Sequence, residues 1–226
     1  MKTEDFNKLK TQFGYDQGLQ SRDDYFNSVI LVLLIPINGE YHFVFQKRSA
    51  EIRQGGEICF PGGKIDETDD TLESVALRET QEEMGIPADK IEVIGKLNTL
   101  VAPMGVIVDA FIGIADITLN ELSINKSEVE RVIAVPVSYF INNLPEQYSV
   151  QVQVHPFLHN EHTGEQTVLL PVVQLGLPET YTKPWGNFRY KVLVYKTDQG
   201  VIWGITARMV HEFVQKIEKL QKDAVA

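Results

Sequence analysis

Three glutamates on one expected helix have the chemistry of a metal site. At 100° per residue, Glu79, Glu82 and Glu83 extend the apolar stripe that Leu72 and Val75 begin, and this stripe is the side that faces a protein core. Carboxylates crowded in a half-buried place raise one another's pKa, a cost that a divalent cation removes. Mg²⁺ and Mn²⁺ bind carboxylate oxygens and leave positions for water and phosphate. A solvated acidic surface is the alternative, but such glutamates normally lie opposite the apolar stripe.

A glycine pair lies upstream of the glutamates. Gly62 and Gly63 end the segment Arg53–Gly63, which has too many glycines, and a proline, to form a helix interior. Glycine allows a backbone carbonyl to approach a metal, or a backbone N–H to approach a phosphate. Arg48 and Arg53 cluster beside this loop in an otherwise acidic chain, and we expect them to bind substrate phosphate.

The elements that must position these groups follow from periodicity and turn signals. A helix is expected over Asp70–Met84, with a capping box of Asp70 and Glu73 at its start and Gly85 at its end. A hairpin is expected around Asn38-Gly39. Strands are expected at 29–35, 41–46, 91–97, 106–115, 131–137, 149–155, 167–175 and 189–195, and a last helix at 206–222.

This order predicts a mixed α/β protein with a β-rich insertion before the C-terminal helix. We divide the chain into an N-terminal arm over 1–27, a single domain over 28–222 with an insertion at 145–187, and a tail over 223–226. Trp203 is expected to lie in the core, and Cys59 is expected to be a buried apolar residue.

The motif around the glutamates resembles that of the Nudix hydrolases. Gly63, Asp70 and, after seven residues, the run Arg78–Ile86 (RETQEEMGI) follow its pattern, with a spacer before Asp70 one residue longer than usual. The run Phe45–Ser49 (FQKRS), followed by Arg53, Gly56 and Phe-Pro-Gly-Gly, is similar to the additional motif of the coenzyme A pyrophosphatase branch. The resemblance implies an α/β/α sandwich with a mixed sheet, and it is strongest over 28–137.

The resemblance also implies Mg²⁺- or Mn²⁺-dependent hydrolysis of a nucleoside diphosphate linked to another group. Coenzyme A or acyl-coenzyme A would give 4′-phosphopantetheine and adenosine 3′,5′-bisphosphate. Arg78 would hold the glutamates in place. The implied metal ligands are Glu79 and Glu83, with Glu82 as an additional one and the carbonyl of Gly62 or Gly63 completing the set.

A carboxylate must take the proton of the attacking water, because the negative oxygens of a pyrophosphate repel a nucleophile. Glu128 is the expected base, and Glu130 and a glutamate of the helix are the alternatives. ADP-ribose, NADH and dinucleoside polyphosphates are the alternative substrates. A module that senses a nucleotide without cleaving it is the second class of function, although such a module has no need of all three glutamates.

Composition limits the kinds of molecule that the protein is expected to bind. The chain has 226 residues and a net charge of −10, which argues against nucleic-acid binding by bulk electrostatics. Its longest apolar run, Val29–Ile35, is too short for a membrane span. One cysteine allows no intrachain disulfide and fits a reducing compartment, so we expect a cytoplasmic protein with a small-molecule nucleotide as partner. The sequence leaves open whether the chain forms homo-oligomers.

Overall fold

The computed structural model describes residues 19–223. Its strands are β1 (Phe26–Ile37), β2 (Glu40–Arg48), β3 (Ile58–Cys59), β4 (Gly62–Lys64), β5 (Ile91–Lys96), β6 (Leu100–Ala102), β7 (Val106–Ala115), β8 (Val129–Pro136), β9 (Glu146–Val154), β10 (Phe157–His159), β11 (Gln166–Val168), β12 (Trp185–Thr197) and β13 (Gly200–Trp203). Its α-helices are α2 (Leu72–Met84), α3 (Val137–Asn142) and α4 (Gly204–Asp223). Short 3-10 helices are η2 (Arg22–Asp24), η3 (Ala88–Lys90), η4 (Leu119–Glu121) and η5 (Glu179–Thr182).

An eight-stranded sheet forms the body of the protein. Its strand order is β3-β2-β1-β7-β5, with β4 paired to β1, β6 to β7 and β8 to β2. β1 and β7 are parallel, whereas the other pairs of this sheet are antiparallel. Asn38 and Gly39 have φ angles of 52° and 83°, the positive values that a two-residue hairpin turn of type I′ requires. The predicted hairpin is therefore confirmed.

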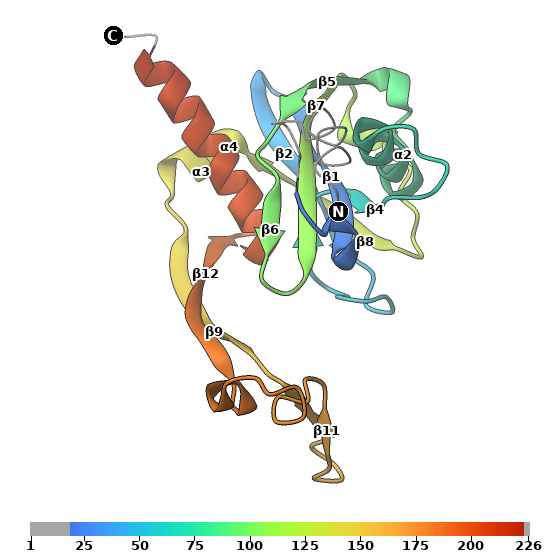
Figure 1. Ribbon diagram of the computed structural model, residues 1–226. Helices are drawn as coiled ribbons and strands as arrows, with labels where there is room; N and C mark the ends of the chain where they lie inside the picture. The colour runs from blue at the N-terminus through green and yellow to red at the C-terminus, as the bar shows by residue number, and fades with distance from the viewer. Residues whose placement is uncertain (1–18, 224–226) are drawn as a thin grey trace, which may run out of the picture.

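Helices cover both faces of this sheet (Figure 1). Side chains of β1 alternate between the faces, as they must in a strand. Val29, Leu31 and Leu33 pack on the side of α2, together with Val75 and Ala76 of that helix. On the opposite face a second core contains residues of β1, β2, α3 and α4, among them Val32, Leu34, Phe43, Phe140, Met209 and Phe213. The predicted α/β/α sandwich with a mixed sheet is confirmed.

Helix α2 begins one residue later than a cap at Asp70 would place it. Thr71 is the N-cap, with extended backbone angles, and its side chain accepts a hydrogen bond from the Ser74 N–H. The Ser74 hydroxyl oxygen in turn accepts from the Thr71 N–H. The predicted capping box of Asp70 and Glu73 is therefore wrong by one position. The predicted end is confirmed, because Gly85 caps the helix with a left-handed backbone, φ 72°.

A buried carboxylate ties the N-terminal part of the described chain to the central strand. Asp109 of β7 is fully buried. It forms an ion pair with Lys96 Nζ at 2.6 Å and another with Arg22, and it accepts a hydrogen bond from the Thr99 hydroxyl at 2.6 Å. Burial opposes the charged form, but these contacts outweigh it and hold the pKa of Asp109 below its usual range.

The segment after α3 leaves the body as an arm (Figure 1). β9 pairs with β12, which pairs with β13, and β10 and β11 form a small hairpin near the far end. The insertion predicted at 145–187 falls mainly on this arm, and its boundaries stay predictions, as do those of the N-terminal arm, of which 1–18 lie outside the described residues. The strand predicted over 167–175 is wrong beyond Val168, where Pro171, without an N–H, precedes a turn.

Among residues 19–223, no helix is both long and apolar enough to cross a membrane.

Candidate active site

The three glutamates of α2 differ sharply in burial. Glu83 is buried, Glu79 keeps 15% of its side chain exposed, and Glu82 keeps 54%. Burial raises the pKa of Glu83 to about 7, and it also raises the pKa of Glu79. The helix therefore presents a row of carboxylates that runs from the core to solvent. Such a row can take up a cation at its buried end and still leave an open side for a ligand.

The glycine pair of β4 lies against this row. The Gly62 N–H donates a hydrogen bond to Glu83 Oε2 at 2.9 Å. A Cβ atom on Gly63 would lie 2.4 Å from the carboxyl carbon of Glu79, so any side chain there would displace that carboxylate. Gly63 also stands opposite Val29 in the sheet. The pairing of β4 with β1 therefore fixes the glycine backbone beside both carboxylates.

Arg78 is held by a carboxylate that the motif comparison did not select. Its Nε and Nη2 atoms donate to the two oxygens of Asp69 at 3.0 and 2.9 Å, and Nη1 lies 3.0 Å from Glu79 Oε1 and 3.2 Å from Glu82 Oε2. Hydrogen bonds from Arg78 hold the pKa of Asp69 below its usual range. Asp70, which the spacing favoured, is exposed. Asp69 therefore anchors the guanidinium that bridges the glutamates.

The two arginines near the glycine loop have different surroundings. Arg48 Nη1 lies 4.0 Å from Glu83 Oε1, and Arg48 Nε donates to the carbonyl of Arg53 at 3.2 Å. The side chain of Arg53 is exposed. Arg48 thus faces the buried glutamate and stabilises the loop, whereas Arg53 extends from the loop surface. A phosphate-binding role for both remains a prediction.

Glu128 and Glu130 flank the first residue of β8 and lie in different environments. The charge of Glu128 contributes to the raised pKa of Glu79, which places the two carboxylates within electrostatic reach. Glu128 Oε1 accepts a hydrogen bond from the Asn125 side chain at 3.1 Å. Glu130 instead pairs with Lys47 Nζ at 2.8 Å. Of the two, Glu128 is therefore the carboxylate within electrostatic reach of Glu79.

A buried glutamine completes the surroundings of Glu83 and was not predicted. Gln46 is fully buried, its Nε2 donates to Cys59 Sγ at 3.8 Å, and its interaction with Glu83 partly offsets the effect of burial on that pKa. Its Oε1 atom is the single buried side-chain oxygen or nitrogen without a hydrogen-bond partner in residues 19–223. The sequence signal was a polar residue at an inward-facing position of an apolar strand.

The donor set suits a hard divalent cation, although it is not a finished coordination shell. Within residues 19–223 no three His, Cys, Asp or Glu side chains converge as a ready metal site. Carboxylate oxygens of Glu79 and Glu83 nevertheless lie beside glycine backbone, and Arg78 carries the charge that now balances Glu79 and Glu82. Oxygen donors with open positions are what Mg²⁺ and Mn²⁺ take. The residues fit such an ion by their chemistry.

The NUDIX domain model matches residues 27–140, half of the chain, and this stretch contains every group described above. The chain belongs to the NUDIX family. Nudix hydrolases generally use divalent metals, in agreement with the oxygen donors on α2.

Relatives of this Nudix hydrolase include coenzyme A diphosphatases. The peroxisomal coenzyme A diphosphatase NUDT7 of Mus musculus is 38% identical over 53% of this chain, a match that spans half of the mouse protein. The mitochondrial coenzyme A diphosphatase NUDT8 of Homo sapiens is 25% identical over 84% of this chain and 69% of its own length. An uncharacterized Nudix hydrolase, NudL of Photorhabdus laumondii, is 28% identical over 76% of this chain and 75% of its own.

Proposed function

We propose that this Nudix hydrolase cleaves the pyrophosphate bond of coenzyme A or acyl-coenzyme A, giving 4′-phosphopantetheine and adenosine 3′,5′-bisphosphate. The main support for hydrolysis is the position of Glu79 and Glu83 beside the glycine backbone of β4, with Arg48 near Glu83. The choice of coenzyme A is supported by similarity to two coenzyme A diphosphatases. We propose Mg²⁺ or Mn²⁺ as the cation and the cytoplasm as the compartment.

Glu79, Glu83 and Glu82 would hold the cation, with a carbonyl of Gly62 or Gly63 as a further ligand. When bound, the cation neutralises phosphate oxygens and lowers the pKa of water. The chain's own residues then orient the reactants. Arg78 holds Glu79 and Glu82 in one geometry through its contacts with both.

The reaction needs one water for each substrate molecule. The water oxygen bonds to one phosphorus, the bridging P–O bond breaks, and each product leaves with one phosphate group of the former pyrophosphate. Glu128 accepts the water proton in this proposal, because it lies within electrostatic reach of Glu79 whereas Glu130 is paired with Lys47. Arg53, exposed on the glycine loop, binds the 3′-phosphate of the substrate, and Arg48 contributes positive charge beside Glu83.

A substrate panel tests the proposal. The purified chain is incubated with coenzyme A, acyl-coenzyme A, ADP-ribose, NADH and diadenosine polyphosphates, each with Mg²⁺, with Mn²⁺ and with EDTA, and products are separated by chromatography. We expect the highest kcat/KM for a coenzyme A substrate and no turnover in EDTA. Faster cleavage of ADP-ribose overturns the substrate assignment. If the chain binds nucleotides but cleaves no member of the panel, the proposed hydrolysis is refuted and a nucleotide-sensing module is favoured.

A further inference from the structure

The sheet of the arm has one face that is apolar along its whole length. Residues directly opposite each other in paired strands share a face, and the register sets Val150 opposite Tyr190 and Val194 opposite Trp203. We call this side the arm face. It consists of Tyr148, Val150, Val152 and Val154 from β9, Phe188, Tyr190, Val192 and Val194 from β12, and Val201 and Trp203 from β13.

The arm face is largely uncovered. Tyr148, Val150, Val154, Phe188, Val201 and Trp203 are each between 47% and 54% exposed. At the base of the arm the apolar residues give way to an ion pair between Glu146 and Lys196. The guanidinium of Arg208 lies over the ring of Tyr190 and covers part of that side chain. Soluble proteins rarely leave so many contiguous apolar side chains in water, because their burial is the main favourable term in folding and association.

The opposite face of β9 is polar, so the pattern is not general exposure of a poorly packed segment. Gln147, Ser149, Gln151 and Gln153 alternate with the apolar residues of the strand, and the stretch 147–154 carries no Asp, Glu, Lys or Arg. β9 is also an edge strand. Natural edge strands are commonly protected by charges or proline, and after Glu146 at its first position this one has neither.

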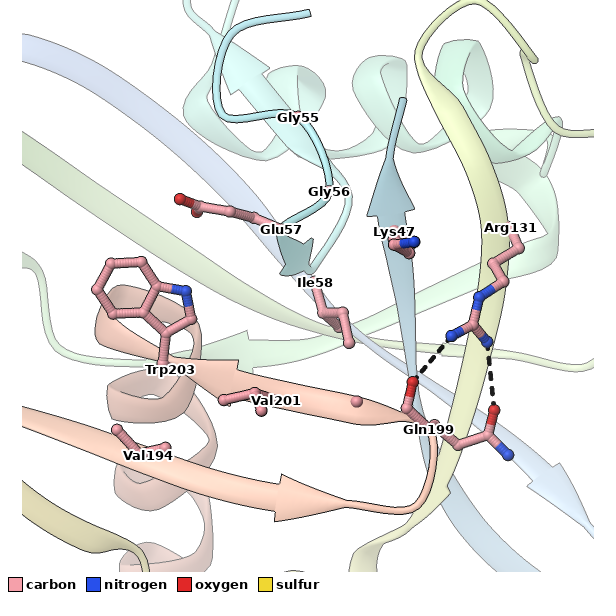
Figure 2. Close-up of a pocket in the computed structure, with 11 residues that line it drawn as sticks. Lys47, Gly55, Gly56, Glu57, Ile58, Arg131, Val194, Gln199, Val201 and Trp203 are labelled. Carbon is pink, nitrogen blue, oxygen red and sulfur yellow. Dashed lines mark hydrogen bonds between the residues drawn. The ribbon is translucent and has the colours of Figure 1, made fainter. Parts of the chain in front are cut away.

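Two grooves border the arm face where it meets the body. One, of about 670 Å³, lies between Val194, Val201 and Trp203 on the hairpin side and Lys47 and Ile58 on the body (Figure 2). Figure 2 also shows Arg131 bonded to Gln199, which fixes the tip of the β12–β13 hairpin above the sheet. The other groove, of about 520 Å³, lies between β9 and the β6–β7 turn at Pro103 and Met104, and its lining includes Val150 and Val152 of the arm face together with Gln151 and Gln153. The arm face therefore opens onto a concave corner.

We infer that the arm face is a dimer interface, covered by the arm face of a second copy of this chain. A sheet that is apolar on one side is covered in proteins by another layer, and two sheets stack about 10 Å apart. Copies with a net charge of −10 repel each other, and the uncharged strip of β9 is where that repulsion is weakest. A twofold axis brings the same patch of both copies together, so an apolar face meets an apolar face.

The size of the arm face agrees with this occupant. Two strands of eight residues, with the four residues of β13 beside them, cover roughly 300 Å², from about 4.8 Å between strands and 3.3 Å per residue. With side-chain relief, two such faces bury on the order of 1,000 Å², the lower bound of a specific interface. A single extended acyl chain is about as wide as one strand and leaves most of the face in water. An anionic bilayer surface repels a chain of this net charge.

Sedimentation velocity of the full chain at concentrations up to about 100 µM tests the inference, a range that detects complexes of micromolar affinity. We expect a species of twice the chain mass of 25.6 kDa. Val150→Lys places an unpaired charge in the interface and raises the dimer dissociation constant by about 100-fold or more. Ser149→Lys adds the same charge to the opposite face, at an exposed position that lines neither groove, and leaves the dimer intact. Circular dichroism shows that both variants fold.

Three results overturn the inference. The first is a wild-type chain that is monomeric at every concentration. The second is a Val150→Lys variant that still dimerises as tightly as the wild type. The third is a monomeric wild type that floats with phosphatidylcholine vesicles, which assigns the arm face to a lipid surface. None of these results bears on hydrolysis, so they are separate from the outcome of the substrate panel.

Discussion

The substitution Asp69→Asn tests how the glutamate row is held in place. Asp69 keeps only 4% of its side chain exposed and accepts two hydrogen bonds from Arg78. Arg78 touches Glu79 and Glu82 with its remaining donors. Asparagine has nearly the same shape, but it loses the charge and offers one acceptor oxygen in place of two. The guanidinium is then free to leave the position from which it bridges the glutamates.

The magnitude follows from the hydrogen bonds lost. A hydrogen bond to a charged group contributes about 1.5–3 kcal/mol, and asparagine retains part of one of the two. Because Arg78 also donates to the Lys64 carbonyl, its release is partial. We therefore expect a loss of about 2 kcal/mol in transition-state stabilisation, or roughly 10- to 100-fold in kcat/KM.

The neighbouring substitution Asp70→Asn is the matched control, because Asp70 is exposed and the sequence motif pointed to it. We expect its kcat/KM to stay within about twofold of wild type, as for surface changes in general. Steady-state hydrolysis of the best panel substrate, at several Mg²⁺ concentrations, gives both numbers, and urea unfolding shows whether either variant is destabilised. Equal activity of the two variants would refute the anchoring of Arg78 by Asp69.

Four further predictions concern single side chains. Glu79→Gln is expected to lower kcat by orders of magnitude while the thermal unfolding temperature without metal is unchanged or higher; near wild-type turnover at saturating Mg²⁺ contradicts the ligand assignment. Glu128→Gln is expected to lower kcat more than Glu130→Gln, and the reverse order moves the base to Glu130. Arg53→Ala is expected to shrink the preference for coenzyme A over 3′-dephospho-coenzyme A by about 1–3 kcal/mol, one charged hydrogen bond, and an equal preference in both proteins refutes a 3′-phosphate contact. Asp109→Asn is expected to destabilise the fold by about 3–5 kcal/mol at pH 7, because it leaves two cations without their buried partner. Since the folded pKa of Asp109 is lowered, its contribution is present above the unfolded carboxyl pKa and is lost as the pH falls through the folded value; urea unfolding from pH 7 to pH 3 is therefore expected to show a smaller loss of stability in the variant than in the wild type.

The glutamate face of the helix, the end of that helix and the hairpin turn were predictable because local geometry fixes them. The spacing of Glu79, Glu82 and Glu83 places them on one side of any α-helix, and Gly85 ends that helix wherever it packs. The turn at Asn38-Gly39 needs positive φ at both residues, which this pair accepts. These features do not depend on distant parts of the chain, so the sequence alone determines them.

Asp69 and Gln46 were missed because their roles depend on contacts between segments. Two aspartates stand side by side before α2, and residue counting cannot tell which one meets Arg78. The loop conformation determines that Asp69 meets Arg78, because the Asp66 N–H donates to Asp69 Oδ2 and fixes the direction of the Asp69 side chain. For Gln46, the pairing of β2 with β3, two segments separated along the chain, brings Cys59 opposite it.

The arm shows why alternation predicts a strand but not its surroundings. Trp203 was predicted to lie in the core, and that prediction is wrong, because it is 47% exposed on the arm face. Its neighbour Ile202 is fully buried against the body, and the two side chains point to opposite sides of β13. A shift of one residue in register would exchange them. The burial of an apolar residue in a strand therefore depends on which face the rest of the molecule covers. On the arm the body covers that face only at the base, and the apolar residues farther along, such as Val150 and Phe188, stay about half exposed within the described part of the chain.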